Sequence, residues 1–177
     1  MRVSTRTPSR YLLGLGEVPR YHRVNELQEV LMAAAVAKSV ADKVKAKFES
    51  GEVLAAFATR TEDGRPWVRY LMVRADDDLN LWTTSALDTR KVHHIRAHPE
   101  VHLTLGVKDL ETAESYVQVE GRAEVLVDEE SRRHMWHDSL SAYFSGPEDP
   151  GYCVIKVTPY RIEFQTMTVA PPEVWEA

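Results

Sequence analysis

The sequence is poor in cysteine and has no long apolar run. Cys153 is the one cysteine among 177 residues, so no disulfide can form within the chain, and a reducing compartment such as the cytoplasm is expected. No apolar run approaches the roughly 18 residues that a membrane-spanning helix requires. The net charge is −5, which excludes the basic excess typical of a nucleic-acid-binding protein. We therefore expect no membrane partner and no nucleic-acid partner.

Motifs for metal binding and for covalent catalysis are also weak. His94 and His98 lie one helical turn apart, a spacing that can hold a metal ion, but no cysteine or acid in the same predicted helix is placed as a third ligand. We interpret these histidines as solvated or hydrogen-bonded and predict no metal site. No serine, threonine or cysteine carries the signature of an activated nucleophile, so the sequence identifies no catalytic residue.

The composition suits one globular domain. Apolar residues make up 44% and charged residues 28% of the chain, which is ordinary for a protein with a core of its own. Residues 1–10 contain three arginines and no acid. A mobile N-terminal tail over residues 1–24 is favoured over a transit peptide, and its apolar piece is too short for a signal sequence. Residues 25–177 are then expected to form a single domain.

A long helix is predicted at the start of this domain. Between Asn25 and Glu49, apolar side chains recur at helical spacing while the lysines fall mainly elsewhere. Ser50-Gly51 follows as a usual helix stop. The apolar stripe would dock on the rest of the domain or on a partner subunit. A helix lying on a membrane surface is the weaker alternative, because its lysines are mixed with acids.

From Val53 the apolar pattern changes to the alternation of β-strands. The predicted strands cover residues 53–61, 66–74, 79–84, 101–107, 116–127 and 152–164. Short helices are expected over about 90–97 and 128–144. A tight turn at 62–64 joins the first two strands, and Gly121 marks a bulge or bend inside a later one. Six antiparallel strands with flanking helices predict a mainly β (α+β) fold, namely a closed or split barrel.

Two of these strands and the following helix start contain the strongest candidate for a binding site. Arg69 and Arg74 lie on one predicted strand, about 16 Å apart in an extended backbone. A guanidinium group suits phosphate because it offers two parallel donors. Thr89 precedes Arg90 and Lys91 at the start of a predicted helix. Free backbone N–H groups beside two cations predict a phosphate site there.

These residues resemble a known family. The stretch 69–74, Arg-Tyr-Leu-Met-Val-Arg, is similar to the Arg-x-x-Leu-x-Lys strand of the FMN-binding split β-barrels related to pyridoxamine 5'-phosphate oxidase. Trp82-Thr83 resembles the aromatic-Thr pair of that family, and Thr89-Arg90-Lys91 resembles its Ser-Arg-Lys. Later strands at 116–121 and 157–164 are similar too. The resemblance covers roughly residues 53–164 and is greatest to the small bacterial general-stress-protein branch.

The resemblance implies a six-stranded antiparallel split β-barrel that binds FMN in a cleft between the two subunits of a homodimer. The resemblance implies that Arg69 binds the FMN phosphate and that Arg74 faces the substrate. Thr83 or Thr84 would meet the edge of the flavin ring, and the choice between them stays open. The cofactor-binding residues that the resemblance implies are Arg69, Leu71, Met72, Arg74, Trp82, Thr83, Thr84, Thr89, Arg90, Lys91 and Tyr116.

Two departures from the oxidase pattern bear on the substrate. Gln165 stands where the oxidase has a tryptophan, and no arginine or histidine follows Arg161, so the cations that help to hold the vitamin phosphate are missing. Tyr116 replaces a glutamine of the oxidase. Pyridoxamine phosphate is therefore not the expected substrate.

The predicted function is FMN-dependent oxidoreduction of an unidentified small molecule, with an electron donor such as NAD(P)H. One alternative is a flavin-binding stress-response module without turnover of its own. Another is a related barrel that holds the deazaflavin F420, FAD or haem in place of FMN.

Overall fold

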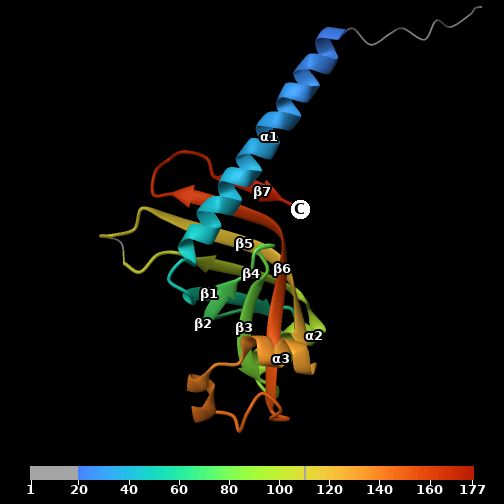
Figure 1. Ribbon diagram of the computed structural model, residues 1–177, viewed down its shortest axis with the longest axis vertical. Coiled ribbons are helices and arrows are strands. Elements are labelled where there is room, and N and C mark those ends of the chain that lie inside the picture. The colour runs from blue at the N-terminus through green and yellow to red at the C-terminus, as the bar shows by residue number, and fades with distance from the viewer. Residues whose placement is uncertain (1–19, 110) are drawn as a thin grey trace, which may run out of the picture. The chain divides into compact units, whose positions relative to one another are not determined.

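The computed structural model of the protein describes residues 20–109 and 111–177 (Figure 1), and most of the predicted tail lies outside them. The chain divides into two compact units, residues 1–33 and 34–177, and all of the described strands belong to the second. Helix α1 (Arg20–Lys47) begins earlier than the predicted start at Asn25. The physical reason is that residues 20–24 contain no glycine or proline to oppose a helix.

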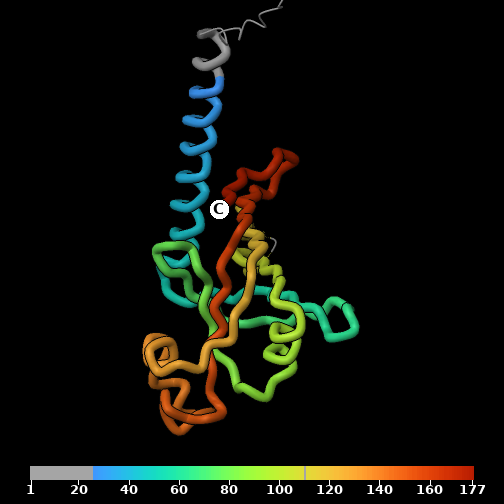
Figure 2. The backbone as a smooth tube through the Cα atoms, turned by 90° about the vertical axis from the view of Figure 1, so that its right-hand side faces the viewer, coloured from blue at the N-terminus to red at the C-terminus, as the bar shows by residue number. Residues whose placement is uncertain are grey.

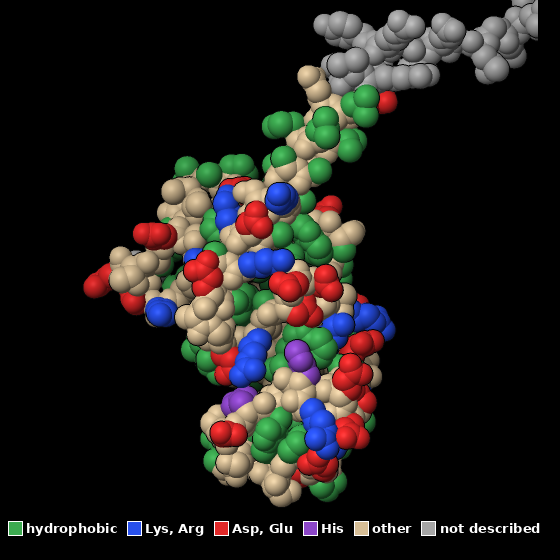
Figure 3. All heavy atoms as spheres, viewed as in Figure 1, with side chains coloured by type: hydrophobic (Ala, Val, Ile, Leu, Met, Phe, Trp, Pro, Cys, Tyr) green, Lys and Arg blue, Asp and Glu red, His purple; other side chains and the backbone are tan. Residues whose placement is uncertain are grey.

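Helix α1 ends where the sequence indicates, but its apolar stripe is only partly buried. Gly51 follows the helix with a φ of +99°, a conformation that glycine adopts at no steric cost. Val40 and Val44 are fully buried in the core, whereas Leu27 and Leu31 are 63% and 67% exposed. Hydrophobic side chains, drawn in green, are accordingly visible along α1 in Figure 3. No helix within residues 20–109 and 111–177 is long and apolar enough to span a membrane.

Six antiparallel strands form a closed barrel, as the sequence predicts. Neighbouring strands follow the order β3-β2-β1-β4-β5-β6, and pairing of β3 with β6 closes the sheet. The long strands β5 and β6 run side by side (Figure 2). The bounds of the six strands are β1 (Val53–Arg60), β2 (Pro66–Ala75), β3 (Leu81–Ala86), β4 (Glu100–Leu105), β5 (Ser115–Leu126) and β6 (Tyr152–Thr166).

The core of the barrel consists of alternate strand side chains. Phe57, Leu103, Val119 and Ile162 are at most 1% exposed and lie on four neighbouring strands. Burial of each such side chain stabilises the fold by about 1.5–3 kcal/mol. Because a slip of one residue would turn these side chains outward, their burial sets the register in which Phe57 of β1 pairs with Arg69 of β2.

Two elements near the C-terminus differ from the prediction. The single helix expected over 128–144 is divided into α3 (Glu129–Met135) and the short 3₁₀ helix η1 (Asp138–Ala142). The intervening break allows Met135 and Leu140 to pack in the same small apolar cluster, so tertiary packing overrides the helical pattern. Strand β7 (Glu173–Glu176) pairs with β6. It was not predicted because four residues are too few to show a clear alternation.

The predicted bulge in β5 is present at Gly121. The register of β5 against β6 shifts between Glu120 and Gly121. A Cβ atom at Gly121 would lie 2.7 Å from Cγ1 of Val157 and 2.8 Å from the carbonyl oxygen of Thr158. The position therefore requires glycine for the close approach of the two backbones.

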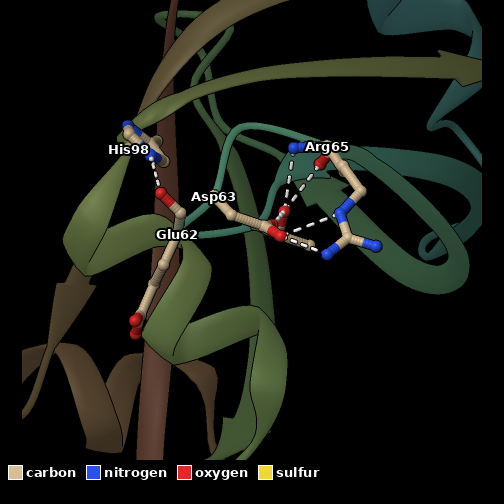
Figure 4. Close-up of polar contacts among 5 residues, drawn as sticks. Glu62, Asp63, Arg65 and His98 are labelled. Carbon is tan, nitrogen blue, oxygen red and sulfur yellow. Dashed lines mark hydrogen bonds and ion pairs between the residues drawn. The ribbon is translucent and has the colours of Figure 1, made fainter.

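The hairpin between β1 and β2 is joined to the end of helix α2 (Arg90–Ala97). Gly64 adopts a φ of +87° in the predicted tight turn, and Arg65 donates to the carboxylate of Asp63. Nε2 of His98 lies 3.2 Å from the carbonyl oxygen of Glu62 (Figure 4). These contacts hold the start of β2 beside α2, and both elements carry predicted site residues.

Candidate functional site

Strand β2 and helix α2 bring three cations together in the region where the sequence predicts a phosphate site. We call Arg69, Arg90 and Lys91 the basic cluster. Arg69 and Lys91 are half-buried and Arg90 is exposed. Burial, followed by repulsion from Arg90, lowers the pKa of Arg69, and burial, followed by repulsion from Arg69, lowers the pKa of Lys91. Arg69 therefore lies close enough to Arg90 and to Lys91 to be repelled by both.

The basic cluster lacks carboxylate partners. Within residues 20–109 and 111–177, ion pairs join eight other basic side chains to acids, but none includes a member of the cluster. Half-buried cations without a counter-ion are unfavourable. An anion bound between them would remove this penalty, so the cluster has the charge and the donors that a phosphate group needs.

Two hydroxyl groups surround the ammonium group of Lys91. Its Nζ atom donates to Oγ of Ser85 at 3.0 Å and to Oγ1 of Thr89 at 3.4 Å, and the two hydroxyl oxygens lie 2.9 Å apart. Ser85 is 5% exposed and was not among the predicted site residues. Its position two residues after Thr83, on the same side of β3, is the signal that could have identified it.

The start of α2 has the predicted position but a different cap. Thr89 is the N-cap residue, with φ −79° and ψ 151°, yet its side chain makes no capping hydrogen bond. The hydroxyl instead donates to the carbonyl oxygen of Ala86 at 2.9 Å, so it leaves the first backbone N–H groups of α2 without a side-chain cap. No acid lies in the first turn of α2. The positive end of the helix dipole therefore adds to the charges of Arg90 and Lys91.

Residues of β1 and α2 support Arg69. Nη1 of Arg69 donates to Oγ1 of Thr59 at 2.7 Å and to the carbonyl oxygen of Phe57 at 3.2 Å. Oγ1 of Thr59 also lies 2.9 Å from Nδ1 of His94. The sequence pattern gives no role to Thr59 and predicts that His94 is solvated or hydrogen-bonded. Their convergence depends on the β1–β2 register and on the packing of α2 against β1.

Several predicted site residues lie away from the basic cluster. Arg74 is an odd number of residues from Arg69, so its side chain leaves the opposite face of β2, where its Nε lies 3.0 Å from Oε1 of Glu52. Trp82 donates from Nε1 to Oδ2 of Asp76 at 2.9 Å. These two residues line a different part of the barrel, and Arg74 already has an anionic partner.

The remaining predicted residues divide between the two faces of their strands. Thr83 is buried at 4% exposure, whereas Thr84 is half-buried on the other side of β3. Leu71 packs against the core and Met72 is 45% exposed on the outer face of β2. Tyr116 is half-buried near the start of β5, where it pairs with Gln165.

Two hollows lie near the site. One has a volume of about 580 Å³ and lies beside the loop that precedes α2, between His93 and Arg96 on one side and Tyr143 and Phe144 on the other. The other has a volume of about 340 Å³ and lies beside Thr59 and Tyr160. Neither hollow is lined by the basic cluster. A ligand whose phosphate is bound by the basic cluster would therefore extend over an open surface of this single chain.

Known proteins share this sequence pattern. The profile of the family described as pyridoxamine 5'-phosphate oxidase matches residues 40–166. General stress protein 26 of Bacillus subtilis (strain 168) is 30% identical over 101 residues, which cover 57% of this chain and 71% of that protein.

Solved structures share the fold as well. The crystal structure of General Stress Protein 26 from Bacillus anthracis is 26% identical, has a TM-score of 0.62, and is matched over 98% of its length and 76% of this chain. A putative pyridoxamine 5'-phosphate oxidase from Listeria innocua is 26% identical, with a TM-score of 0.60 over 96% of that chain and 70% of this one. A heme-binding protein from Mycobacterium smegmatis, 12% identical with a TM-score of 0.60 over 57% of that chain and 80% of this one, shows the fold alone.

Proposed function

Because the chain belongs to the pyridoxamine 5'-phosphate oxidase family, in the branch of general stress protein 26, we propose that it is a flavoprotein that binds FMN through the basic cluster. The observation that supports this most directly is the group of three cations on β2 and at the start of α2, none of which is paired with a carboxylate among the residues that the structure describes. Hydrogen bonds between charged groups of this kind contribute about 1.5–3 kcal/mol each. Arg69 and Lys91 would hold the phosphate, and the hydroxyl groups of Ser85 and Thr89 would orient Lys91.

The activity we propose is oxidoreduction of a small molecule. FMN, when bound, supplies hydride and electron chemistry, while the protein binds and orients it. Leu71, Met72, Trp82, Thr83 or Thr84, and Tyr116 remain proposed contacts of the flavin beyond its phosphate. Arg74 remains a proposed substrate-side residue, although a substrate would have to compete with Glu52 for its guanidinium. Pyridoxamine phosphate is not the proposed substrate, because no cation follows Arg161 to hold a second phosphate.

A homodimer is part of the proposal. Leu54, Val68, Tyr70 and Met72 are 53%, 62%, 72% and 45% exposed on neighbouring strands β1 and β2. Contiguous exposed apolar side chains of this kind mark interaction surfaces. A second copy of the chain on this face would cover them and form the missing wall of the flavin cleft. We place the protein in the cytoplasm because its one cysteine is free and buried.

A second candidate function is flavin binding in a stress response without turnover. It is favoured by the absence, among the described residues around the basic cluster, of a side chain with an evident acid–base role. Addition of NAD(P)H under anaerobic conditions separates the two functions. Bleaching of the flavin absorbance would support an oxidoreductase, whereas a bound flavin that no donor reduces would support the binding module.

The first test of the cofactor is an absorption spectrum of the purified protein, recorded before and after addition of FMN and removal of the excess. Flavin bands that remain with the protein would support the proposal. An intense band in the near ultraviolet would indicate haem instead. A protein that takes up the deazaflavin F420 but not FMN would have the deazaflavin as its cofactor. A colourless protein that fails to retain FMN would overturn the flavin proposal.

A further inference from the structure

The hydroxyl group of Thr59 lies between a fixed donor and a ring nitrogen. Arg69 can only donate hydrogen bonds, so Oγ1 of Thr59 must accept the 2.7 Å bond from Nη1. The one hydroxyl hydrogen of Thr59 is then free to point toward Nδ1 of His94, 2.9 Å away. This direction requires that Nδ1 carry no proton. The hydrogen-bonded chain from Arg69 through Thr59 to His94 then runs in one direction, with the proton of a neutral imidazole on Nε2. In the opposite arrangement, a protonated Nδ1 would donate to the second lone pair of Oγ1.

We propose that Thr59 and His94 are positioning residues that hold the guanidinium of Arg69 in place for a phosphate group. This inference rests on the proposed FMN-phosphate site and names two residues behind it that do not touch the ligand. Arg69 has a flexible side chain, and an unsupported arginine loses conformational entropy when it binds an anion. Anchoring through Thr59 orders Arg69 before the phosphate arrives, which favours binding by pre-organisation.

The surroundings of His94 keep its imidazole neutral. The side chain is 8% exposed, and the ring of Trp67 lies against its edge, with ring centroids 6.5 Å apart. Burial, followed by the charges of Arg69 and Arg90, lowers the pKa of His94, and Glu62 opposes this effect while His93 adds to it. A neutral ring has one unprotonated nitrogen, and a hydrogen bond donated by the hydroxyl of Thr59 requires that this be Nδ1. A protonated ring would have no acceptor for that hydroxyl, so Nδ1 would donate to Oγ1 and the direction of this hydrogen bond would reverse.

The chain offers matched variants that separate positioning from packing. Thr59→Val keeps the shape of the side chain and removes the hydroxyl group, whereas Thr59→Ser keeps the hydroxyl group. His94→Ala removes the acceptor, whereas His94→Asn retains a side-chain oxygen close to the place of Nδ1 and cannot be protonated. Riboflavin is the matched ligand, because it differs from FMN only in lacking the phosphate.

The experiment measures the dissociation constants of FMN and riboflavin for the full chain by quenching of flavin fluorescence. Thr59→Val and His94→Ala should weaken FMN binding on the order of tenfold and leave riboflavin binding unchanged. Thr59→Ser and His94→Asn should restore FMN binding to within about twofold of the original protein. Equal losses for both ligands, or a Thr59→Val variant that binds FMN like the original protein, would overturn the inference while the FMN site stands.

A measurement on the unaltered protein tests the hydrogen bonds from Arg69 through Thr59 to His94 without flavin. The ¹⁵N chemical shifts of the His94 ring at pH 7.5 should show Nδ1 unprotonated and Nε2 protonated, even if a variant fails to fold. A proton on Nδ1 would overturn the inference. An original protein that binds FMN no more tightly than riboflavin would overturn the proposed phosphate site, and that failure is recognised before any variant is made.

Discussion

The guanidinium carbon of Arg90 lies 4.5 Å from the centre of the Trp67 ring. Trp67 is at the start of β2 and Arg90 is at the start of α2, so the contact joins the two elements that form the basic cluster. A cation over the face of a tryptophan is stabilised by the negative charge of the ring face. The stack therefore stabilises Arg90 in the basic cluster despite its repulsion with Arg69.

Replacement of Trp67 should weaken phosphate binding through this stack. An exposed cation–π contact contributes about 0.5–1 kcal/mol, so Trp67→Leu is expected to weaken FMN binding about two- to fivefold. Trp67→Phe retains an aromatic face and should lose less. Flavin titrations of the two variants check whether Trp67→Leu loses more FMN affinity than Trp67→Phe. A Trp67→Leu variant with unchanged affinity would show that Arg90 does not depend on Trp67.

Removal of two cations should abolish FMN binding while the protein stays folded. Arg69→Ala combined with Lys91→Ala removes two charge-assisted donors, each of which contributes about 1.5–3 kcal/mol to phosphate binding. The control is Arg65→Ala combined with Arg133→Ala, which removes the same charge from exposed arginines that are paired with carboxylates. Circular dichroism checks the fold and a flavin titration checks the affinity. Undiminished binding in the first variant would mean that the site is elsewhere.

The stability of the protein should depend on the protonation of His94. Burial, and then the neighbouring arginines, lower the pKa of this histidine in the folded protein below 6.5. The unfolded chain therefore takes up the proton first, and the free energy of unfolding should fall as the pH drops from about 6.5 through the lower folded pKa. His94→Asn should remove this component. Urea denaturation across that pH range measures the free energy of unfolding of the two proteins. Parallel curves of this free energy against pH would exclude a contribution of His94 to the pH dependence.

Substitution of Gly121 should destabilise the barrel. The added Cβ of Gly121→Ala meets Val157 at 2.7 Å and the backbone of Thr158 at 2.8 Å, so strands β5 and β6 have to separate locally. Overpacking of this kind costs about 1–3 kcal/mol, which chemical denaturation can measure. Gly64→Asn is the control, because Gly64 faces open space and asparagine tolerates its positive φ. If both variants were equally stable, the bulge would be more adaptable than its packing indicates.

The thiol of Cys153 should be unreactive in the folded protein. The side chain is fully buried, and this burial raises the pKa of the thiol despite the opposing effect of Lys91, so both access and the thiolate form are disfavoured. Ellman's reagent should detect no thiol under native conditions and one thiol per chain after unfolding in guanidinium. Rapid labelling of the native protein would mean that the pairing of β3 with β6, which covers Cys153, opens readily.

Elements with local signals could be predicted from the amino-acid sequence. Alternation of apolar residues predicts all six barrel strands, because each strand buries one face. Gly121 marks the bulge, where two backbones approach closely, and Gly64 marks the turn, where φ is positive. The helix start at Thr89 places Arg90 and Lys91 at a positive helix end. Together with Arg69, these residues carried the resemblance to the family, and the structure brings all three cations together.

Contacts between side chains that are distant in the sequence depend on the folded chain. The supporting layer depends on the pairing of Phe57 with Arg69 and on the packing of α2 against β1. These relations place Thr59 and His94 behind Arg69, although the two residues are 35 positions apart in the chain. Likewise, the break after Met135 follows from the burial of Met135 and Leu140 in one cluster. Local patterns specify the period and the ends of an element, whereas the register between elements is set by burial of the whole core, which a single stretch of sequence does not reveal.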